Sequence, residues 1–391
     1  MPEWKSTRLG DICTTNKDSY SSKDNWKIVN YLDTGSITEN KITELQYIDI
    51  ETDKLPSRAR RKVRKDSILY STVRPNQLHY GIIKELVDNL LVSTGFTVID
   101  VDTNKAIPEF IYYILTQKNT TEQLQAIAEQ SVSTYPSIKA TDIENLKLKL
   151  PNLAIQKKIV AILDTIDSKI RQNEKINNNL EQQAKVLYKD WFFDFSPFSS
   201  DGNLPNGWHF GTVGDIIQLH DSKRVPLSGA ERDKMAKVYP YYGATSLMDY
   251  VDNYLFDGIY LLLGEDGTVV DSLGFPILQY VYGQFWVNNH AHIITGKEGF
   301  SVEELYLFFS LTNIKSIVTG AVQQKVSQQN LKKVPAIIPS KQALSAFDEI
   351  IQPIFAQIRN LRDENANLSQ LRDTLLPKLM SGELDVSDID L

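Results

Sequence analysis

The chain has 391 residues, 42% of them hydrophobic and 23% charged, which are the proportions of an ordinary soluble globular protein of two or three domains. Its net charge of −7 argues against a protein that coats nucleic acid nonspecifically, although it leaves room for local basic faces. The single cysteine, Cys13, excludes an intrachain disulfide and a cysteine-based metal cage; with no membrane-length apolar run and no apolar signal core after Met1, we expect a cytoplasmic protein without a membrane segment.

Residues 1–150 are predicted to form a first globular domain of mostly short strands. Runs of β-forming residues predict strands at 28–32, 67–73, about 80–83 and 91–99. Helices are expected at 108–118, which begins with a proline, and at 121–130.

A long helix is predicted over residues 155–191, within a central segment 151–196 that opens with Pro151. Apolar or Asn residues recur there at alternating spacings of four and three, a pattern that only a helix places on one face and that is typical of a coiled-coil seam. The seam positions are Ile159, Leu163, Ile166, Ile170, Asn173, Asn177, Leu180, Ala184, Leu187 and Trp191.

Residues 197–339 are predicted to form a second globular domain, with strands at 257–263 and 286–294 and a helix at 301–310. A second long helix, residues 344–379, follows Pro339 within a C-terminal segment 340–391. Its seam positions, each 188 residues after a counterpart in the first helix, are Phe347, Ile351, Ile354, Ile358, Leu361, Asn365, Leu368, Arg372, Leu375 and Leu379. The chain is therefore an internal repeat of two halves.

The linker between the first helix and the second domain is too short for a parallel return, so the helices are expected to pair antiparallel. The predicted fold class is α+β, with two globular domains at opposite ends of an antiparallel two-helix coiled coil and a pseudo-twofold axis between the halves. Asn177 and Asn365 are expected to fix the register of the seam. Pro353 is expected either to kink the second helix or to delay its start.

Catalytic motifs are missing from the sequence. It has no G-x-x-x-x-G-K-[ST] phosphate loop, no G-x-G-x-x-G after a strand, no H-E-x-x-H, and no Pro-Pro dipeptide of the kind found in amino-methylating enzymes. The stretch 264–267 is interpreted as a hairpin turn. His290 and His292 are a poor metal pair. We expect a binding protein with no active site and no metal.

Two segments of the first domain are candidates for DNA contact. A basic run could contact phosphates or simply form a solvated turn face; it comprises Arg58, Arg60, Arg61, Lys62, Arg64 and Lys65. A turn after the strand at 67–73 could read guanine or adenine edges or be only a polar hairpin tip; it carries Arg74, Asn76, Gln77, His79 and Tyr80. A later loop adds Ser133, Tyr135 and Lys139.

The second domain has different side chains at the places taken as equivalent. They are Glu265, Asp266 and Thr268 on the turn, Asn288, Asn289, His290 and His292 after it, and Gln323, Gln324, Lys325 and Gln328 in the later loop. Carboxylates can accept a hydrogen bond from cytosine. Such differences fit two readers of different half-sites, and they equally fit neutral drift after a duplication.

Four stretches together resemble the specificity subunit of type I restriction–modification enzymes over essentially the whole chain. They are Leu69-Tyr70-Ser71-Thr72-Val73-Arg74-Pro75-Asn76 with Val92-Ser93-Thr94-Gly95-Phe96; Tyr239-Pro240-Tyr241-Tyr242-Gly243-Ala244 with Leu262-Leu263-Gly264-Glu265-Asp266-Gly267 and Val287-Asn288-Asn289-His290-Ala291; Ile155-Gln156-Lys157-Lys158-Ile159-Val160; and Leu375-Leu376-Pro377-Lys378-Leu379-Met380-Ser381-Gly382-Glu383-Leu384. Tyr242, within the second stretch, joins the candidates for DNA contact.

The resemblance implies that each globular domain is a target recognition domain reading one half of a split, asymmetric site in double-stranded DNA. It implies that the helix pair sets the spacer and docks two methyltransferase subunits, which bind S-adenosylmethionine and modify adenine. Restriction subunits that use ATP and Mg would complete the assembly, and this chain would bind no cofactor and supply no catalytic residue. The alternatives are a coiled-coil scaffold or inhibitor protein without sequence-specific readout, or an enzyme that acts alone.

Overall fold

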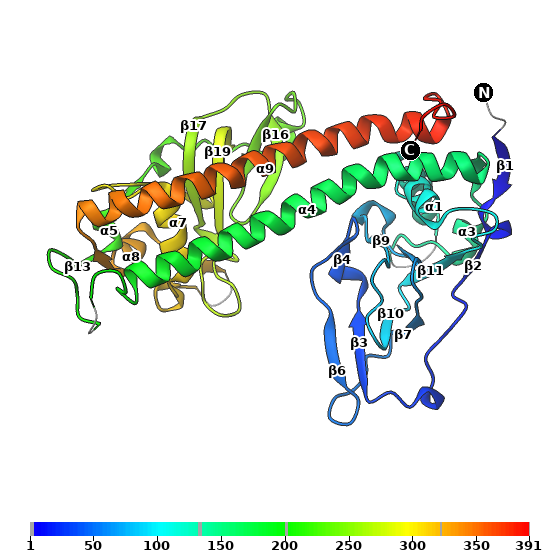
Figure 1. The fold of residues 1–391 in the computed structure, drawn as a ribbon, viewed down its shortest axis with the longest axis horizontal. Coiled ribbons are helices and arrows are strands. Elements are labelled where there is room, and N and C mark those ends of the chain that lie inside the picture. The colour runs from blue at the N-terminus through cyan, green and yellow to red at the C-terminus, as the bar shows by residue number, and fades with distance from the viewer. Residues whose placement is uncertain (1–3, 132–134, 200–201, 321–322, 391) are drawn as a thin grey trace. The chain divides into compact units, whose positions relative to one another are not determined.

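Two long helices are the largest elements of the computed structural model, which describes residues 4–131, 135–199, 202–320 and 323–390 (Figure 1). Helix α4 spans Leu153–Phe192 and helix α9 spans Lys341–Ser381. The two predicted long helices are therefore confirmed, each a few residues longer than predicted. No helix in the described part of the chain is long and apolar enough to cross a membrane.

Both helices begin at a side-chain cap that directly follows a proline. Asn152 Oδ1 accepts a hydrogen bond from the Ile155 N–H at 3.0 Å, and Ser340 Oγ accepts one from the Ala343 N–H at 3.2 Å. Such caps satisfy N–H groups that have no partner within the helix. The proline–cap pair therefore fixes where each helix starts.

The chain divides into two compact units, and each long helix contributes to both. Unit 1 comprises Met1–Arg171 and Asn365–Leu391, and unit 2 comprises Gln172–Glu364. The first part of α4 and the last part of α9 thus belong to unit 1, whereas the remaining parts of both helices belong to unit 2.

Within each unit the two helices pair antiparallel, because residue numbers rise along α4 as they fall along α9. In unit 1, Asp167 of α4 pairs with Arg372 at 3.2 Å, and the Ile170 carbonyl accepts from Asn365 Nδ2 at 3.3 Å. In unit 2, Asn173 Nδ2 donates to Glu364 Oε2 at 2.8 Å, and the rings of Tyr188 and Phe347 lie 5.6 Å apart. None of the predicted seam positions is exposed, so the seam is confirmed.

The seam holds buried amides, although not as one pair of equivalent residues. Asn173 is completely buried and Asn177 is 8% exposed, whereas Asn365 is half-buried and bonds to a main-chain carbonyl.

Helix α9 begins at Lys341 and continues through Pro353, so of the two effects expected of Pro353 the late start is wrong. Pro353 lies on the exposed side, and burial of neighbouring residues such as Ile351 on the other side holds the helix together despite the lost hydrogen bond.

Unit 1 is built from short strands in two four-stranded sheets and two pairs. The strands are β1 (Lys5–Arg8), β2 (Cys13–Thr15), β3 (Ile28–Leu32), β4 (Ile37–Thr38), β5 (Lys41–Ile42), β6 (Gln46–Asp49), β7 (Ala59–Lys62), β8 (Ile68–Ser71), β9 (Tyr80–Ile82), β10 (Leu90–Ser93), β11 (Phe96–Val101) and β12 (Lys147–Leu150). The sheets have the orders β6-β3-β10-β7 and β2-β11-β8-β9, and β1 pairs with β12 and β4 with β5. Helices α1 (Pro108–Leu115), α2 (Lys118–Glu129) and α3 (Ala140–Glu144) lie between β11 and β12 in the chain.

Unit 2 repeats this order around one six-stranded sheet. Its strands are β13 (His209–Thr212), β14 (Ile217–Leu219), β15 (Tyr239–Tyr242), β16 (Leu247–Val251), β17 (Phe256–Gly264), β18 (Asp266–Gly267), β19 (Leu278–Val287), β20 (Ala291–Gly296), β21 (Gln324–Lys325) and β22 (Pro335–Ile338). The sheet order is β14-β20-β17-β19-β15-β16, with β13 paired to β22 and β18 to β21. The helices of its globular part are α5 (Val213–Ile216), α6 (Gly229–Arg232), α7 (Val302–Leu311) and α8 (Gln328–Lys332).

Two predicted strands are each two strands in the structure. The segment 91–99 contains β10 and β11, which belong to different sheets and turn at Gly95, where a Cβ atom would lie 2.8 Å from Thr34 Cγ2. The segment 286–294 contains the end of β19 and the start of β20. Asn288 Oδ1 accepts from the His290 N–H at 2.8 Å and so closes the turn between these two strands.

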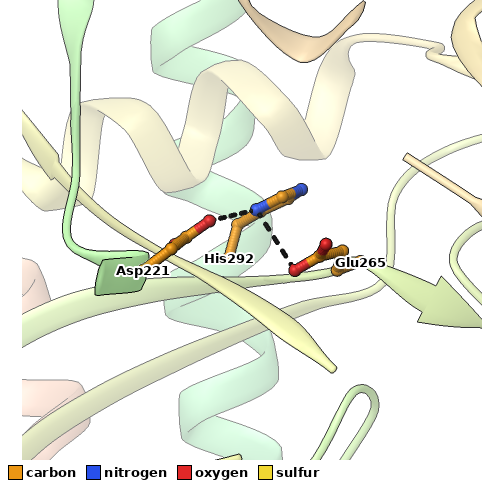
Figure 2. Close-up of side chains that lie close together, drawn as sticks. All are labelled: Asp221, Glu265 and His292. Carbon is orange, nitrogen blue, oxygen red and sulfur yellow. Dashed lines mark hydrogen bonds and ion pairs between the residues drawn. The ribbon is translucent and has the colours of Figure 1, made fainter. Parts of the chain in front are cut away.

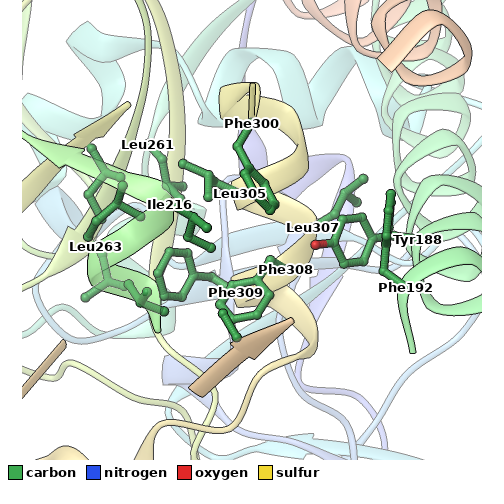
Figure 3. Packing of buried hydrophobic residues seen from close by; sticks show 14 of the residues in the cluster. Tyr188, Phe192, Ile216, Leu261, Leu263, Phe300, Leu305, Leu307, Phe308 and Phe309 are labelled. Atoms are coloured by element: carbon green, nitrogen blue, oxygen red, sulfur yellow. The ribbon is translucent and has the colours of Figure 1, made fainter. Parts of the chain in front are cut away.

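The core of unit 2 forms around α7, as Figure 3 shows. One side of α7 meets the sheet at Leu261 and Leu263, and the other side meets Tyr188 and Phe192 of α4; the buried α7 side chains between them are Leu305, Leu307, Phe308 and Phe309. The core of unit 1 similarly joins its globular part to both long helices, with Leu163 of α4 and Leu379 of α9 buried in one cluster.

Glu304, on the buried α7, gives unit 2 a pH-dependent stability. Its side chain is fully buried, and its Oε1 atom has no hydrogen-bond partner among the described residues. Burial raises the pKa of this carboxyl from 4.5 to about 8, against the opposing hydrogen bond from the Ser301 N–H. Because the folded state binds a proton that the unfolded state releases, the contribution of Glu304 to stability is fully present below pH 4.5 and is lost as the pH rises through about 8.

We expect Glu304→Gln to stabilise unit 2 at pH 8 by up to a few kcal/mol and to have little effect near pH 5. Glutamine keeps an oxygen for the Ser301 N–H but buries no charge. Urea unfolding at both pH values measures the difference. Glu349→Gln, on the exposed side of α9, is the control and should change neither value. An equal effect of Glu304→Gln at pH 5 and pH 8 would contradict the assignment.

Candidate nucleic-acid interface

Each unit places a turn directly after a buried strand and beside the loop that leads to a short helix. In unit 1 the Thr72 carbonyl, after β8, accepts from the Ile138 N–H at 2.9 Å, shortly before α3. In unit 2 the Glu265 carbonyl, after β17, accepts from the Val326 N–H at 2.8 Å, shortly before α8. The two turns are therefore equivalent, with Glu265 at the place of Thr72 and not, as the sequence suggested, at the place of Arg74.

The turn of unit 1 brings together Arg74 and Tyr135, which are 61 positions apart in the sequence. The guanidinium carbon of Arg74 lies over the Tyr135 ring, 5.0 Å from its centroid, and the Tyr135 side chain is 56% exposed. Asn76 and Gln77 follow in an exposed 3-10 turn. Lys139 is exposed at the start of α3. These side chains form a polar surface around the end of β8.

Two candidates in unit 1 are structural residues. Tyr80 is only 6% exposed and stacks on Tyr70 with ring centroids 5.8 Å apart, so its ring packs in the core of unit 1 and presents little surface to DNA. Burial raises the pKa of the Tyr80 hydroxyl. The His79 ring is half-buried, and its Nδ1 atom lies 2.7 Å from the Ile37 carbonyl, to which it must donate. Ser133 lies outside the described residues.

The basic run lies on β7 and the turns on either side of it. Carboxylates neutralise part of its charge. Lys62 forms an ion pair with Asp24, and Arg64 pairs with Asp18 and, at 2.9 Å, with Asp100. Arg61 is half-buried, and burial lowers the pKa of its guanidinium. The exposed cations of this run that form no ion pair with a described carboxylate are Arg58, Arg60 and Lys65. A phosphate would therefore meet fewer cations here than the sequence suggests.

In unit 2 the equivalent turn is tied into a buried ion network. Asp221, Glu265 and His292 lie together, with one ligand atom of each within 4.8 Å of the others (Figure 2). His292 Nδ1 is 2.6 Å from Asp221 Oδ2 and 3.8 Å from Glu265 Oε2. Arg224 reaches Glu265 Oε2 at 2.5 Å, and Lys325 reaches Glu265 Oε1 at 3.6 Å.

The hydrogen bonds define the charges in this network. His292 Nε2 faces the Val326 carbonyl at 2.8 Å, and since a carbonyl only accepts, Nε2 carries a proton. Nδ1 faces the Asp221 carboxylate, so both ring nitrogens of His292 lie against oxygen acceptors. Asp221 also accepts from the Ile293 N–H at 2.9 Å and from Gln328 Nε2 at 2.6 Å. Burial raises the pKa of Asp221, but these hydrogen bonds outweigh it and the pKa lies below its usual value.

A metal ion at this cluster would have to displace existing partners. The nearest Asp221 and Glu265 oxygens and His292 Nδ1 are already engaged with one another or with Arg224, and two cationic side chains balance the two carboxylates. The geometry therefore favours an internal ion network over a metal site. Glu265, predicted as a cytosine acceptor, is already bound to Arg224 in this network.

The remaining candidates of unit 2 have mixed environments. Asn288 is only 4% exposed and shapes the turn between β19 and β20, so it too presents little surface to DNA. Asp266 forms an ion pair with His290, whose side chain is partly exposed. Tyr242 is half-buried against Phe285. The exposed candidates are Thr268, Asn289, Gln323 and Lys325, while Gln324 and Gln328 are half-buried.

Sequence reasoning missed two residues that organise this site, Asp221 and Arg224. They lie in a charged turn after β14, three residues apart, and their side chains are mostly buried. Only the alternation of charge in the segment 220–224 could have drawn attention to them, and that pattern is also typical of an exposed turn.

Comparison with known proteins agrees with these observations. The profile of the family described as "Type I restriction modification DNA specificity domain" matches residues 1–182 and 205–370. The type I restriction enzyme HindI specificity subunit of Haemophilus influenzae is 26% identical over 472 residues, covering 98% of this chain and all of the relative. The MjaIX specificity subunit of Methanocaldococcus jannaschii is 26% identical, covering 83% of this chain and 79% of the relative.

A solved structure shares the fold. The S subunit of a type I restriction–modification system from M. genitalium matches with a TM-score of 0.56 at 16% identity, over 97% of this chain and 96% of that chain. The repeated α and β units and the matched residues define a DNA-specificity protein. The chain belongs to the family of type I restriction–modification specificity subunits. It is the DNA-recognition subunit of such a system. The resemblance seen in the sequence is thus confirmed.

Proposed function

We propose that the globular part of each unit is a target recognition domain that reads one half of a bipartite, asymmetric site in double-stranded DNA. The observation that carries this proposal is the pair of equivalent turns. In unit 1 the turn presents Arg74, Asn76 and Gln77, whereas in unit 2 the corresponding turn ties Glu265 to Arg224 and presents Thr268. One backbone arrangement with two sets of exposed side chains is suited to two different half-sites.

We further propose that α4 and α9 form one antiparallel coiled coil with the two recognition domains at its opposite ends, related by a pseudo-twofold axis. The antiparallel pairing within each unit supports this arrangement. A helix of 40 residues spans about 60 Å at about 1.5 Å per residue, and half-sites one DNA turn apart are about 34 Å from centre to centre. The coiled coil would thus set the gap between the half-sites.

In this proposal the chain works in the cytoplasm as a non-catalytic subunit. Two methyltransferase subunits dock on the helix pair and bring the S-adenosylmethionine that modifies adenine, and restriction subunits bring ATP and Mg chemistry. The missing catalytic motifs and the internally satisfied Asp221–Glu265–His292 cluster support a chain that contributes no active site.

Methylation-sensitive sequencing of DNA from cells that express the chain with its methyltransferase tests the proposal. The expected result is a split motif with modified adenines and a fixed spacer. Expression of the methyltransferase without the chain is the control and should give no motif. Modification without a sequence pattern, or DNA binding with no enriched motif when all partners are present, would favour a scaffold or inhibitor role instead.

We expect replacement of residues 1–150 by the corresponding segment of another family member to change one half of the motif only. The reason is that the turn, its neighbouring loop and their supporting strands all lie within this segment. The motif before and after replacement is read by the same sequencing. Replacement of residues 197–339 is the matched experiment and should change only the other half; a change of both halves by either replacement would contradict the modular reading.

A further inference from the structure

We infer that Arg74, held in a left-handed turn and stacked on Tyr135, determines one base pair of the half-site of unit 1 by binding a guanine. This assignment rests on the proposed function, in which unit 1 reads DNA, and adds the residue and the base that it recognises.

The backbone at Arg74 is strained in a way that the other unit avoids. Arg74 has φ 47° and ψ 70°, a left-handed conformation, and it directly precedes Pro75, which disfavours helical conformations of the residue before it. The equivalent residue of unit 2 is Gly267, with φ 91°. Glycine adopts such a conformation without steric cost. Unit 1 therefore carries a large side chain at a position where glycine would fit without strain. Such strain is typical of residues that contact a ligand.

The turn around Arg74 is fixed on several sides. The Arg74 N–H donates to the Pro136 carbonyl at 3.0 Å, and the Arg74 carbonyl accepts from the Gln77 N–H at 2.8 Å. The Asn76 N–H donates to Gln125 Oε1 at 3.2 Å. A guanidinium projecting from so rigid a turn loses little freedom on binding.

The side chain of Arg74 is positioned without being neutralised. Its guanidinium lies over the Tyr135 ring, while no carboxylate or carbonyl partner is found for it among the described residues. Arg64, by contrast, is paired with two carboxylates. A guanidinium held over an aromatic ring still has its N–H donors available for a second partner.

The donor pattern selects the base. Arginine offers only donors, and guanine presents two acceptors, O6 and N7, side by side in the major groove. Adenine pairs an acceptor with a donor, which suits Asn or Gln and not Arg. Phosphate oxygens also accept two N–H bonds from Arg, but a phosphate contact carries no sequence information. Base and phosphate contacts therefore predict different effects of mutation.

The test uses the full chain in complex with its methyltransferase subunits and a library of random-sequence DNA duplexes. The variants are Arg74→Lys, which keeps the charge and loses the planar fork, and Arg74→Gly, which matches Gly267 of unit 2. Tyr135→Phe keeps the stacking ring, and Tyr135→Ala removes it. Each complex is assayed for base preference at every motif position and for its thermal unfolding midpoint.

Arg74→Lys and Arg74→Gly are expected to reduce discrimination about 10- to 100-fold at one guanine of one half-site and to leave the other positions unchanged. The thermal unfolding midpoint of Arg74→Gly should be no lower than that of the wild type. The loss of base discrimination then does not result from unfolding. Tyr135→Phe should retain the preference, and Tyr135→Ala should weaken it at the same guanine. An unchanged motif, or weaker binding to all sequences alike, would overturn the assignment. A wild-type complex that selects no motif would refute the proposed function itself.

Discussion

Replacement of Asp221 by alanine is expected to destabilise unit 2 by about 3–5 kcal/mol, because it leaves several buried hydrogen-bond donors without their shared acceptor. The His292 side chain is completely buried and donates to Asp221, and two further donors converge on the same carboxylate. Without these hydrogen bonds, the turn that carries Glu265 is no longer held in place. We therefore expect recognition of one half-site to fail together with stability, as measured by urea unfolding and by the motif selected from a duplex library.

Two variants make this prediction specific. Asp221→Asn keeps an oxygen for the Ile293 N–H and nearly the same side-chain shape, so it should cost less than alanine. Asp252→Ala removes an exposed carboxylate of the same unit and should change stability by less than about 0.5 kcal/mol. Equal costs for Asp221→Ala and Asp252→Ala would show that the network does not stabilise unit 2.

Replacement of Phe347 by alanine should cost about 3–5 kcal/mol, since the ring is fully buried where α9 meets α4. Its centroid lies 4.9 Å from that of Phe192, 5.2 Å from that of Trp191 and 5.6 Å from that of Tyr188. Alanine leaves a cavity among three rigid aromatic rings that cannot easily close. Urea unfolding followed by tryptophan fluorescence reports the loss, because Trp191 is part of the cluster.

The matched control lies one turn along the same helix. Ile350 is 41% exposed, so Ile350→Ala removes a comparable apolar side chain with little burial and should cost less than about 1 kcal/mol. If the two variants unfolded at the same urea concentration, the aromatic cluster would not be what holds α9 in unit 2.

The helices could be predicted from the sequence more fully than the strands. The alternating seam from Ile159 to Trp191 has one periodic explanation, and the prolines Pro151 and Pro339 mark where the caps begin. The apolar run 91–99 gave no comparable signal of its turn, because β10 and β11 are both buried. A single buried strand and a pair of buried strands have the same sequence pattern when only two residues, here Thr94 and Gly95, separate the pair.

The candidate site could be predicted in part, and the reason lies in tertiary contacts. Arg74 and Tyr135 could each be named from residue type and loop position, but their stacking depends on the hydrogen bond that joins Thr72 to Ile138. Tyr80 seemed available because it follows a polar turn, yet all of β9 is buried and the Tyr80 ring packs on Tyr70. Glu265 was named without Arg224, which lies 41 residues earlier in the chain.

The division of the long helices between the units has a consequence for biosynthesis. Unit 2 is one continuous stretch, Gln172–Glu364, so all of its residues are synthesised before the last part of α9. Unit 1 needs both ends of the chain, since Leu379, Met380 and Val386 complete a core begun by Ile155 and Leu163. The half that is translated first is therefore finished last, and until then its apolar helix face is exposed to chaperones and proteases.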